Sequence, residues 1–319
     1  MPAFLLVRTM YILETLFPIV AIAFLAWLAA RRQIVSDTEV QALEKLTFTW
    51  LVPCMLFYGT ATADLPDVMD WDLLWSYYLA IFAVYLGGML IARLRFGPGQ
   101  VRLSVIGMGC AYPNVTILGI PICLELLGEA AFVPMFMLIS LNNLLILSFG
   151  TILAELKREE GSALRAHLAR IGAGLVKNPI SGSLIAGILV NLAGVPVYAP
   201  LLESLELLSR AAIPAALLTL GAGLNRYRVK GEITMALVLT GMKLLVLPGL
   251  VWFLAFFVFD LDVLWARTAV LLACMPVGIT VYVFSIRYKS CENLVATAIV
   301  MSCMLSVLSI SLFAVLLHL

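Results

Sequence analysis

The residues with the clearest potential for chemistry are prolines and small polar side chains inside long apolar runs. Pro113 and Pro121 lie eight residues apart, with Asn114, Thr116 and Gly119 between them. A proline has no N–H and its ring clashes with the carbonyl four residues earlier, so a helix tends to break there. At membrane depth, freed backbone groups are tolerated only where they pack in protein or face a watery cavity. We therefore interpret this segment as an interrupted helix beside a ligand site.

A second segment repeats this pattern in the other half of the chain. Pro276 and Gly278 lie two residues apart, and Thr280 follows them. Two interrupted helices can direct two helix N-termini at one place, where unpaired N–H groups favour an anion. The Asn114 amide adds two donors and an acceptor. The alternative is a pair of ordinary proline kinks, but their matched positions favour a central site. The residues that we predict to bind substrate are Tyr112, Pro113, Asn114, Thr116, Pro276, Val277, Gly278 and Thr280.

The composition places these segments in a membrane. Of the 319 residues, 63% are apolar and 12% are charged, against about 45–50% and about 25% in soluble domains. This excludes a water-soluble globule and a disordered chain. The net charge of +1 lacks the excess of basic residues that is typical of a nucleic-acid-binding protein. Two histidines and six cysteines without CxxC spacing predict no metal site and no cofactor, with the cysteines as small apolar core residues.

Ten segments of about 20 apolar residues are long enough to cross a bilayer. They predict an all-α integral membrane protein in which the fourth and ninth helices are broken and cross. The first run ends at Arg31-Arg32 without a cleavage site, so we interpret it as a retained helix rather than a signal peptide. The polar stretch 155–170 predicts a short surface helix. The ten segments are 9–30, 40–62, 72–93, 102–126, 131–155, 171–193, 201–224, 232–258, 264–286 and 293–317.

The basic residues predict the orientation of these spans. Of the 20 Lys and Arg residues, 16 fall on the side opposite the N-terminus, whereas acidic residues gather on the N-terminal side. The positive-inside rule makes the basic side cytoplasmic. We therefore predict a multi-pass protein of the plasma (cell inner) membrane with both termini outside. Four aromatic residues predict an interface belt near the outer surface: Trp71, Trp75, Tyr77 and Tyr78.

The two halves of the chain resemble each other in their prolines. Three proline pairs recur at offsets of 161, 161 and 163 residues: Pro18 and Pro179, Pro53 and Pro214, Pro113 and Pro276. Each repeat holds five spans, an odd number, so the second repeat enters the membrane from the opposite side. Inverted repeats with interrupted helices in matching positions are typical of secondary transporters. The predicted repeats are residues 1–158 and 159–319.

Other polar residues inside the spans each have two interpretations. A charge at bilayer depth costs roughly 2.5–3.5 kcal/mol on insertion scales. Lys243 therefore has a functional and a structural interpretation. It is a counter-charge to an anionic substrate or to a proton-carrying acid, or else it pairs structurally with a carbonyl or a carboxylate. Arg210 is expected to snorkel outward. The remaining candidates for cavity lining or coupling, with packing or solvation as the alternative, are Asn142, Asn143, Tyr282, Glu14 and Asp64.

Several motifs of the sequence resemble those of one family. The segment 112–121, YPNVTILGIP, resembles the fourth-span signature of the auxin efflux carrier family, and 275–284 is similar to that family's ninth-span crossover. Lys177-Asn178-Pro179 resembles the basic-Asn-Pro start of span 6, which makes Asn178 a further candidate. Lys243 followed by Pro248 resembles a basic residue and proline of span 8. The resemblance covers essentially the whole chain.

This resemblance implies a fold and a substrate class. Spans 1, 2, 6 and 7 would form a scaffold that makes a homodimer, and spans 3–5 and 8–10 would form a transport domain that moves as an elevator. The short loop after span 5 resembles that of prokaryotic members, whose substrates include dicarboxylates such as malate and malonate. Auxin-like acids are the other substrate class that the family implies.

The leading hypothesis is therefore a secondary transporter of a small organic anion, coupled to protons or driven by the membrane potential. A sodium-coupled carrier of the bile acid symporter type is the alternative within transport. An intramembrane enzyme is a remote alternative, because the sequence has no HExxH, GxSxG or paired carboxylate motif. The expected partners are the anion, the lipid bilayer and a second copy of the chain.

Overall fold

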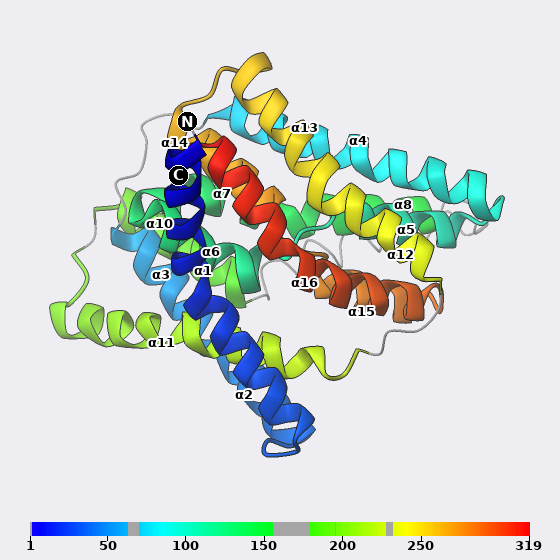
Figure 1. The fold of residues 1–319 in the computed structure, drawn as a ribbon. Coiled ribbons are helices and arrows are strands. Elements are labelled where there is room, and N and C mark those ends of the chain that lie inside the picture. The colour runs from blue at the N-terminus through cyan, green and yellow to red at the C-terminus, as the bar shows by residue number, and fades with distance from the viewer. Residues whose placement is uncertain (1, 63–69, 156–178, 195, 228–231) are drawn as a thin grey trace.

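The chain is described by a computed structural model that covers residues 2–62, 70–155, 179–194, 196–227 and 232–319. Three predictions lie outside these residues: Asn178, Asp64 and the predicted surface helix at 155–170, of which only the first residue, Glu155, is described. The described part is helical throughout and contains no strand (Figure 1). Its α-helices are α1 (Pro2–Arg31), α2 (Asp37–Leu46), α3 (Val52–Thr62), α4 (Trp71–Phe96), α5 (Gln100–Ala111), α6 (Ile120–Leu127), α7 (Phe132–Asn142), α8 (Ser148–Glu155), α10 (Pro179–Leu192), α11 (Ala199–Leu224), α12 (Ile233–Gly241), α13 (Leu247–Phe253), α14 (Val263–Ala273), α15 (Ile279–Arg287) and α16 (Glu292–Leu316).

Short π-helical turns join several of these helices end to end. They are η1 (Thr47–Leu51), η2 (Val115–Gly119), η4 (Asn143–Leu147), η5 (Met242–Val246) and η6 (Leu254–Val258), and η3 (Glu129–Ala131) is a 3₁₀ turn. Three π turns end just before a proline: Pro53, Pro121 and Pro248. In each, the residue before the proline donates to the carbonyl five residues earlier, as Ile120 does to Val115. A wider turn accommodates a residue that cannot donate.

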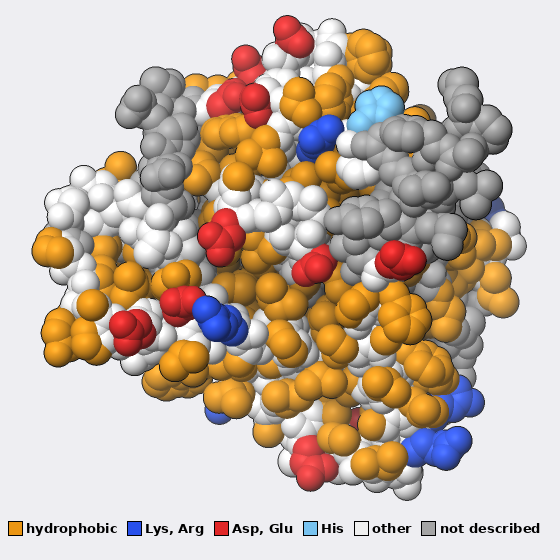
Figure 2. All heavy atoms as spheres, turned by 60° about the vertical axis from the view of Figure 1, so that its left-hand side comes forward, with side chains coloured by type: hydrophobic (Ala, Val, Ile, Leu, Met, Phe, Trp, Pro, Cys, Tyr) orange, Lys and Arg blue, Asp and Glu red, His pale blue; other side chains and the backbone are white. Residues whose placement is uncertain are grey.

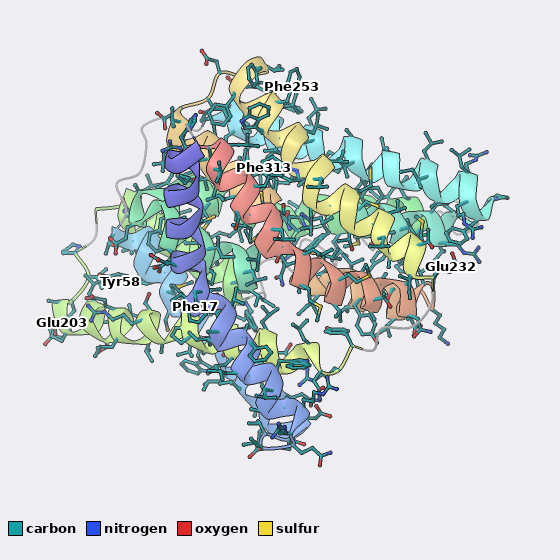
Figure 3. All side chains as sticks on the ribbon, in the orientation of Figure 1. Phe17, Tyr58, Glu203, Glu232, Phe253 and Phe313 are labelled. Atoms are coloured by element: carbon teal, nitrogen blue, oxygen red, sulfur yellow. The ribbon has the colours of Figure 1, made fainter. Side chains whose placement is uncertain are left out.

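Among the described residues, five continuous helical stretches are long and apolar enough to cross a membrane: Trp71–Phe96, Glu129–Ala154, Ala199–Leu224, Ile233–Val258 and Glu292–Leu316. Hydrophobic side chains spread over much of the described part of the face that Figure 2 shows, as expected for a protein surrounded by lipid. Glu203 near the start of α11 and Glu232 just before α12 lie at opposite sides of the molecule in the view of Figure 3. The total of ten spans stays a prediction.

The helices pack in two sets. In the first set, α1 packs against α11, and α3 packs against both α10 and α11. In the second set, α4 packs against α5, α12 against α16, and α13 against α14. The sets meet where α1 contacts α16 and α6, and where α11 contacts η2. Figure 1 shows both chain ends near each other at one end of the molecule.

The predicted aromatic belt is half wrong. Trp71 and Trp75 are exposed at 62% and 61%, as a belt requires, but Tyr77 and Tyr78 are buried. The Tyr78 hydroxyl donates to the Leu138 carbonyl at 2.5 Å. The apolar residues of α4 are distributed around the whole helix, so composition alone does not indicate which aromatic side chains face inward.

Glycines allow the closest helix contacts. A Cβ at Gly221 of α11 would lie 1.9 Å from the backbone oxygen of Ala23 in α1. Gly223, two residues further along the same helix, has no atom within 4 Å of its virtual Cβ. Small residues at helix interfaces let backbones approach in membranes, where lipid removes most of the hydrophobic drive for association.

We therefore predict opposite effects for two matched substitutions. Gly221→Ala forces α1 and α11 apart and should lower the free energy of unfolding by about 1–3 kcal/mol. Gly223→Ala meets no atom and should be neutral or stabilising by up to about 1 kcal/mol, because alanine favours a helix over glycine. Thermal unfolding of both variants in detergent measures this difference. Equal midpoints for the two variants would contradict the close α1–α11 contact.

Candidate functional site

The two proline segments that the sequence singles out interrupt their helices and lie against each other. The helix break between α5 and η2 spans residues 112–114, and the break between α14 and α15 spans residues 274–278. Pro113 and Val277 form an antiparallel bridge. The Asn114 N–H donates to the Pro276 carbonyl at 2.8 Å, and the Gly278 N–H donates to the Tyr112 carbonyl at 3.0 Å. Each break thus provides hydrogen-bond partners for the other.

Side chains from other helices pair the remaining backbone groups of the second break. In an unbroken helix, the Val277 N–H would donate to the Ala273 carbonyl. Instead, it donates to Ser302 Oγ at 3.0 Å, and the Ala273 carbonyl accepts from Lys243 Nζ at 2.7 Å. Ser302 and Lys243 therefore replace the two halves of one lost helical hydrogen bond.

Pro121 behaves differently from Pro113. The sequence predicts that both prolines free backbone groups within one broken span, but the helix continues from η2 into α6 through Pro121. Pro121 occupies the second position of α6 and follows a π turn. The only interruption of this segment is the one at residues 112–114, which has the second break as its partner.

Two helical segments begin directly after the paired breaks. η2 starts at Val115 and continues into α6, and α15 starts at Ile279. The first N–H groups of a helical segment have no partner within it, and its dipole is positive at that end. No side-chain cap is formed at Asn114 or Gly278. The arrangement can attract an anionic group from two directions.

Buried amides without partners lie at the same place. Asn114 is 6% exposed, and its Nδ2 has no hydrogen-bond partner among the described residues. Asn142 is 1% exposed, and neither of its amide atoms has a partner within that same part. The Tyr112 hydroxyl donates to Asn143 Oδ1 and lies within interaction range of Asn142 and Thr280. A buried polar group without a partner costs stability, so such groups are typical of ligand sites.

The other predicted residues have different surroundings. Lys243 is fully buried and binds a backbone carbonyl, which is the structural alternative of the two considered. Thr116 is half-buried in η2, and the ring of Tyr282 meets Tyr227 edge-on at 5.0 Å. Glu14 is exposed on α1. Arg210 pairs with Glu206 on the surface of α11 at 2.6 Å.

Ser302 is the contact residue that the sequence reasoning missed. It is one of several serines in α16, a long apolar helix, and nothing in the spacing distinguishes it from its neighbours. Its role depends on Pro276 freeing a donor in another helix. Only the packing of α16 against the second break identifies it.

A cavity of about 840 Å³ lies where the two helix sets meet. Leu118 of η2 and Ile122 of α6 line it, so the segment that begins at Asn114 forms one wall. The other walls come from α1, α11 and α16, and they are almost entirely apolar. Arg31 and Asn225 line the cavity as well, and the Arg31 guanidinium lies 5.0 Å from the ring centre of Trp27.

We predict that the pairing of the breaks tolerates no side chain at Gly278. A Cβ there would lie 2.5 Å from Tyr112 Cδ1 and 3.2 Å from the Pro113 carbonyl oxygen. Gly278→Ala should lower the free energy of unfolding by about 1–3 kcal/mol because the two breaks must separate. Gly241→Ala is the control, since its Cβ meets nothing within 4 Å. A thermal midpoint of Gly278→Ala at or above that of Gly241→Ala would contradict the prediction.

Sequence comparison relates the chain to membrane transporters. The model of a family described as "Membrane transport protein" matches residues 11–314. An "Uncharacterized transporter" of Methanothermobacter thermautotrophicus is 25% identical over 311 residues, which cover 95% of this chain and 98% of the relative. A "Putative malonate transporter" of Rhizobium meliloti is 22% identical over 300 residues, 92% of each chain. The chain belongs to the membrane transport protein family, which is the auxin efflux carrier family that its fourth-span motif resembles.

Proposed function

We propose that this membrane transporter is a secondary carrier of a small organic anion, with its binding site at the paired breaks. The observation that carries the proposal is the cluster of unpaired buried amides beside two helix N-termini. Asn114 and Asn142 would donate to a carboxylate, and the backbone N–H groups at Val115 and Ile279 would add donors and favourable dipoles.

A small carboxylate is the substrate class that this chemistry favours. The polar side-chain groups that hydrogen-bond at the paired breaks in the described part are amides, hydroxyls and the Lys243 ammonium, which can donate hydrogen bonds to a negative charge. One relative carries malonate in its name, so a dicarboxylate is the first candidate and an auxin-like acid the second. Transport would be proton-coupled or driven by the membrane potential.

The proposed mechanism is an elevator-type movement between the two helix sets. The set of α1, α2, α3, α10 and α11 would be the scaffold and the site of homodimer contact. The second set, from α4 to α8 and from α12 to α16, would carry the site across the membrane. The paired breaks would then lie at the centre of two inverted five-helix repeats. In this proposal the carrier lies in the inner or plasma membrane with both termini outside.

We predict that Asn114→Ala weakens binding without unfolding the protein. Loss of a hydrogen bond to a charged group costs about 1.5–3 kcal/mol, so the apparent affinity for the anion should fall about 10- to 100-fold. The measurement is uptake of radiolabelled malonate into proteoliposomes, together with thermal stabilisation of the purified protein by malonate, malate and indole acetate. Asn293→Ala, at an exposed amide near the start of α16, is the control and should behave as the wild type.

Three outcomes distinguish the hypotheses. Unchanged uptake kinetics in Asn114→Ala would remove this residue from the site. Stabilisation by an acid only in the presence of sodium would favour a bile-acid-type symporter. No stabilisation by any acid and no uptake would contradict anion transport.

A further inference from the structure

Lys243 is a fully buried cation whose partner is a helix end. The residue is 0% exposed, and Nζ donates to the Ala273 carbonyl at 2.7 Å. Ala273 is the last residue of α14, where the helix dipole places negative partial charge. None of the ion pairs among the described residues includes Lys243. Burying an ammonium without a carboxylate is costly, and the negative end of α14 is the partner that the structure gives it.

The position of Lys243 follows from a proline. Pro248 has no N–H, and the preceding turn is the π turn η5, in which the Leu247 N–H donates to the Met242 carbonyl. Lys243 lies within this turn. The Leu244 carbonyl, which would pair with residue 248 in a regular helix, accepts from Ser309 Oγ at 2.5 Å. Ser309 of α16 thus fixes the backbone next to Lys243, and the Lys243 side chain reaches α14.

The end of a broken membrane helix is where carriers commonly hold a coupling cation, because its free carbonyls offer ligands. Of the last carbonyls of α14, three are already occupied: those of Val270 and Leu271 accept from the Cys274 N–H, and that of Leu272 accepts from the Met275 N–H. The fourth, at Ala273, is occupied by Lys243. The Ala273 carbonyl is therefore bound to the Lys243 ammonium and is not free to bind an inorganic cation.

We propose that the Lys243 ammonium is a built-in cation at the broken end of α14, where it takes the place of a sodium ion and fixes the break that pairs with Tyr112–Asn114. This inference rests on the proposed function, since it concerns the ion that a secondary carrier would use. Lys243 is a positioning residue: it holds the Ala273 carbonyl, and Ser302 holds the matching N–H. The carrier then needs no sodium.

Chemical rescue tests the charge at this position directly. Lys243→Ala removes the atoms of a propylammonium ion and leaves space for one. We expect this substitution to lower the thermal midpoint by roughly 3–10 °C, and 1–50 mM n-propylammonium to restore a large part of the loss. The same concentration of 1-propanol, which lacks the charge, should not. Lys243→Met fills the space with a neutral chain, so it should be destabilised and not respond to the amine.

Two controls separate the charge from general packing. Ser302→Ala removes the acceptor of the Val277 N–H and should be destabilised without any rescue by propylammonium. The wild type should have the same thermal midpoint, and the same malonate uptake if it transports malonate, when choline chloride replaces sodium chloride at equal ionic strength. The midpoints are measured without substrate, so they test this inference even if anion transport fails.

Three results would overturn the inference. The first is saturable stabilisation of the wild type by sodium and not by potassium or choline. The second is a Lys243→Met variant as stable as the wild type. The third is a destabilised Lys243→Ala variant that neither propylammonium nor sodium restores, which would make the side chain a space-filling element only.

Discussion

The fold depends on the need to pair every backbone polar group that a proline frees inside an apolar environment. Water is not available there, and an unpaired N–H or carbonyl in hydrocarbon costs several kcal/mol. The breaks at Pro113 and Pro276 meet this need by exchanging two backbone hydrogen bonds. Neither break could be stable at its place alone, so the two segments must fold as one unit although they lie far apart in the sequence.

The same constraint assigns roles to the polar side chains of the second helix set. Ser302 and Ser309 of α16 and Lys243 of η5 each bond to a backbone group at or beside a proline-disturbed turn. They are structural in the sense that each has a backbone hydrogen-bond partner. Asn114 and Asn142 are equally buried, but amide atoms of theirs have no partner within the described residues. Buried groups that the fold leaves unpaired are the ones available to a ligand.

Much of this organisation could be predicted from the sequence, because it follows from local rules. The prolines indicated where two helices break, and length and apolarity indicated the long helices. The matched prolines also predicted that the two breaks meet, but the hydrogen bonds that other segments supply to each break could not be predicted. Pro113 interrupts its helix because residues 276–278 lie beside it, whereas Pro121 only widens a turn. Likewise, Ser302 resembles the other serines of α16, and only packing distinguishes it.

The pairing of the breaks also constrains how the site could move. Every hydrogen bond that holds it, from α5 and η2 to α14, α15, η5 and α16, lies within the second helix set. A hinge inside this set would have to break bonds that have no replacement in an apolar environment. By contrast, the boundary between the second set and the helices α1 and α11 contains a largely apolar cavity. If the second set slid along this boundary, few polar contacts would break. These hydrogen bonds are compatible with the movement proposed above, in which the whole second set moves with the site intact.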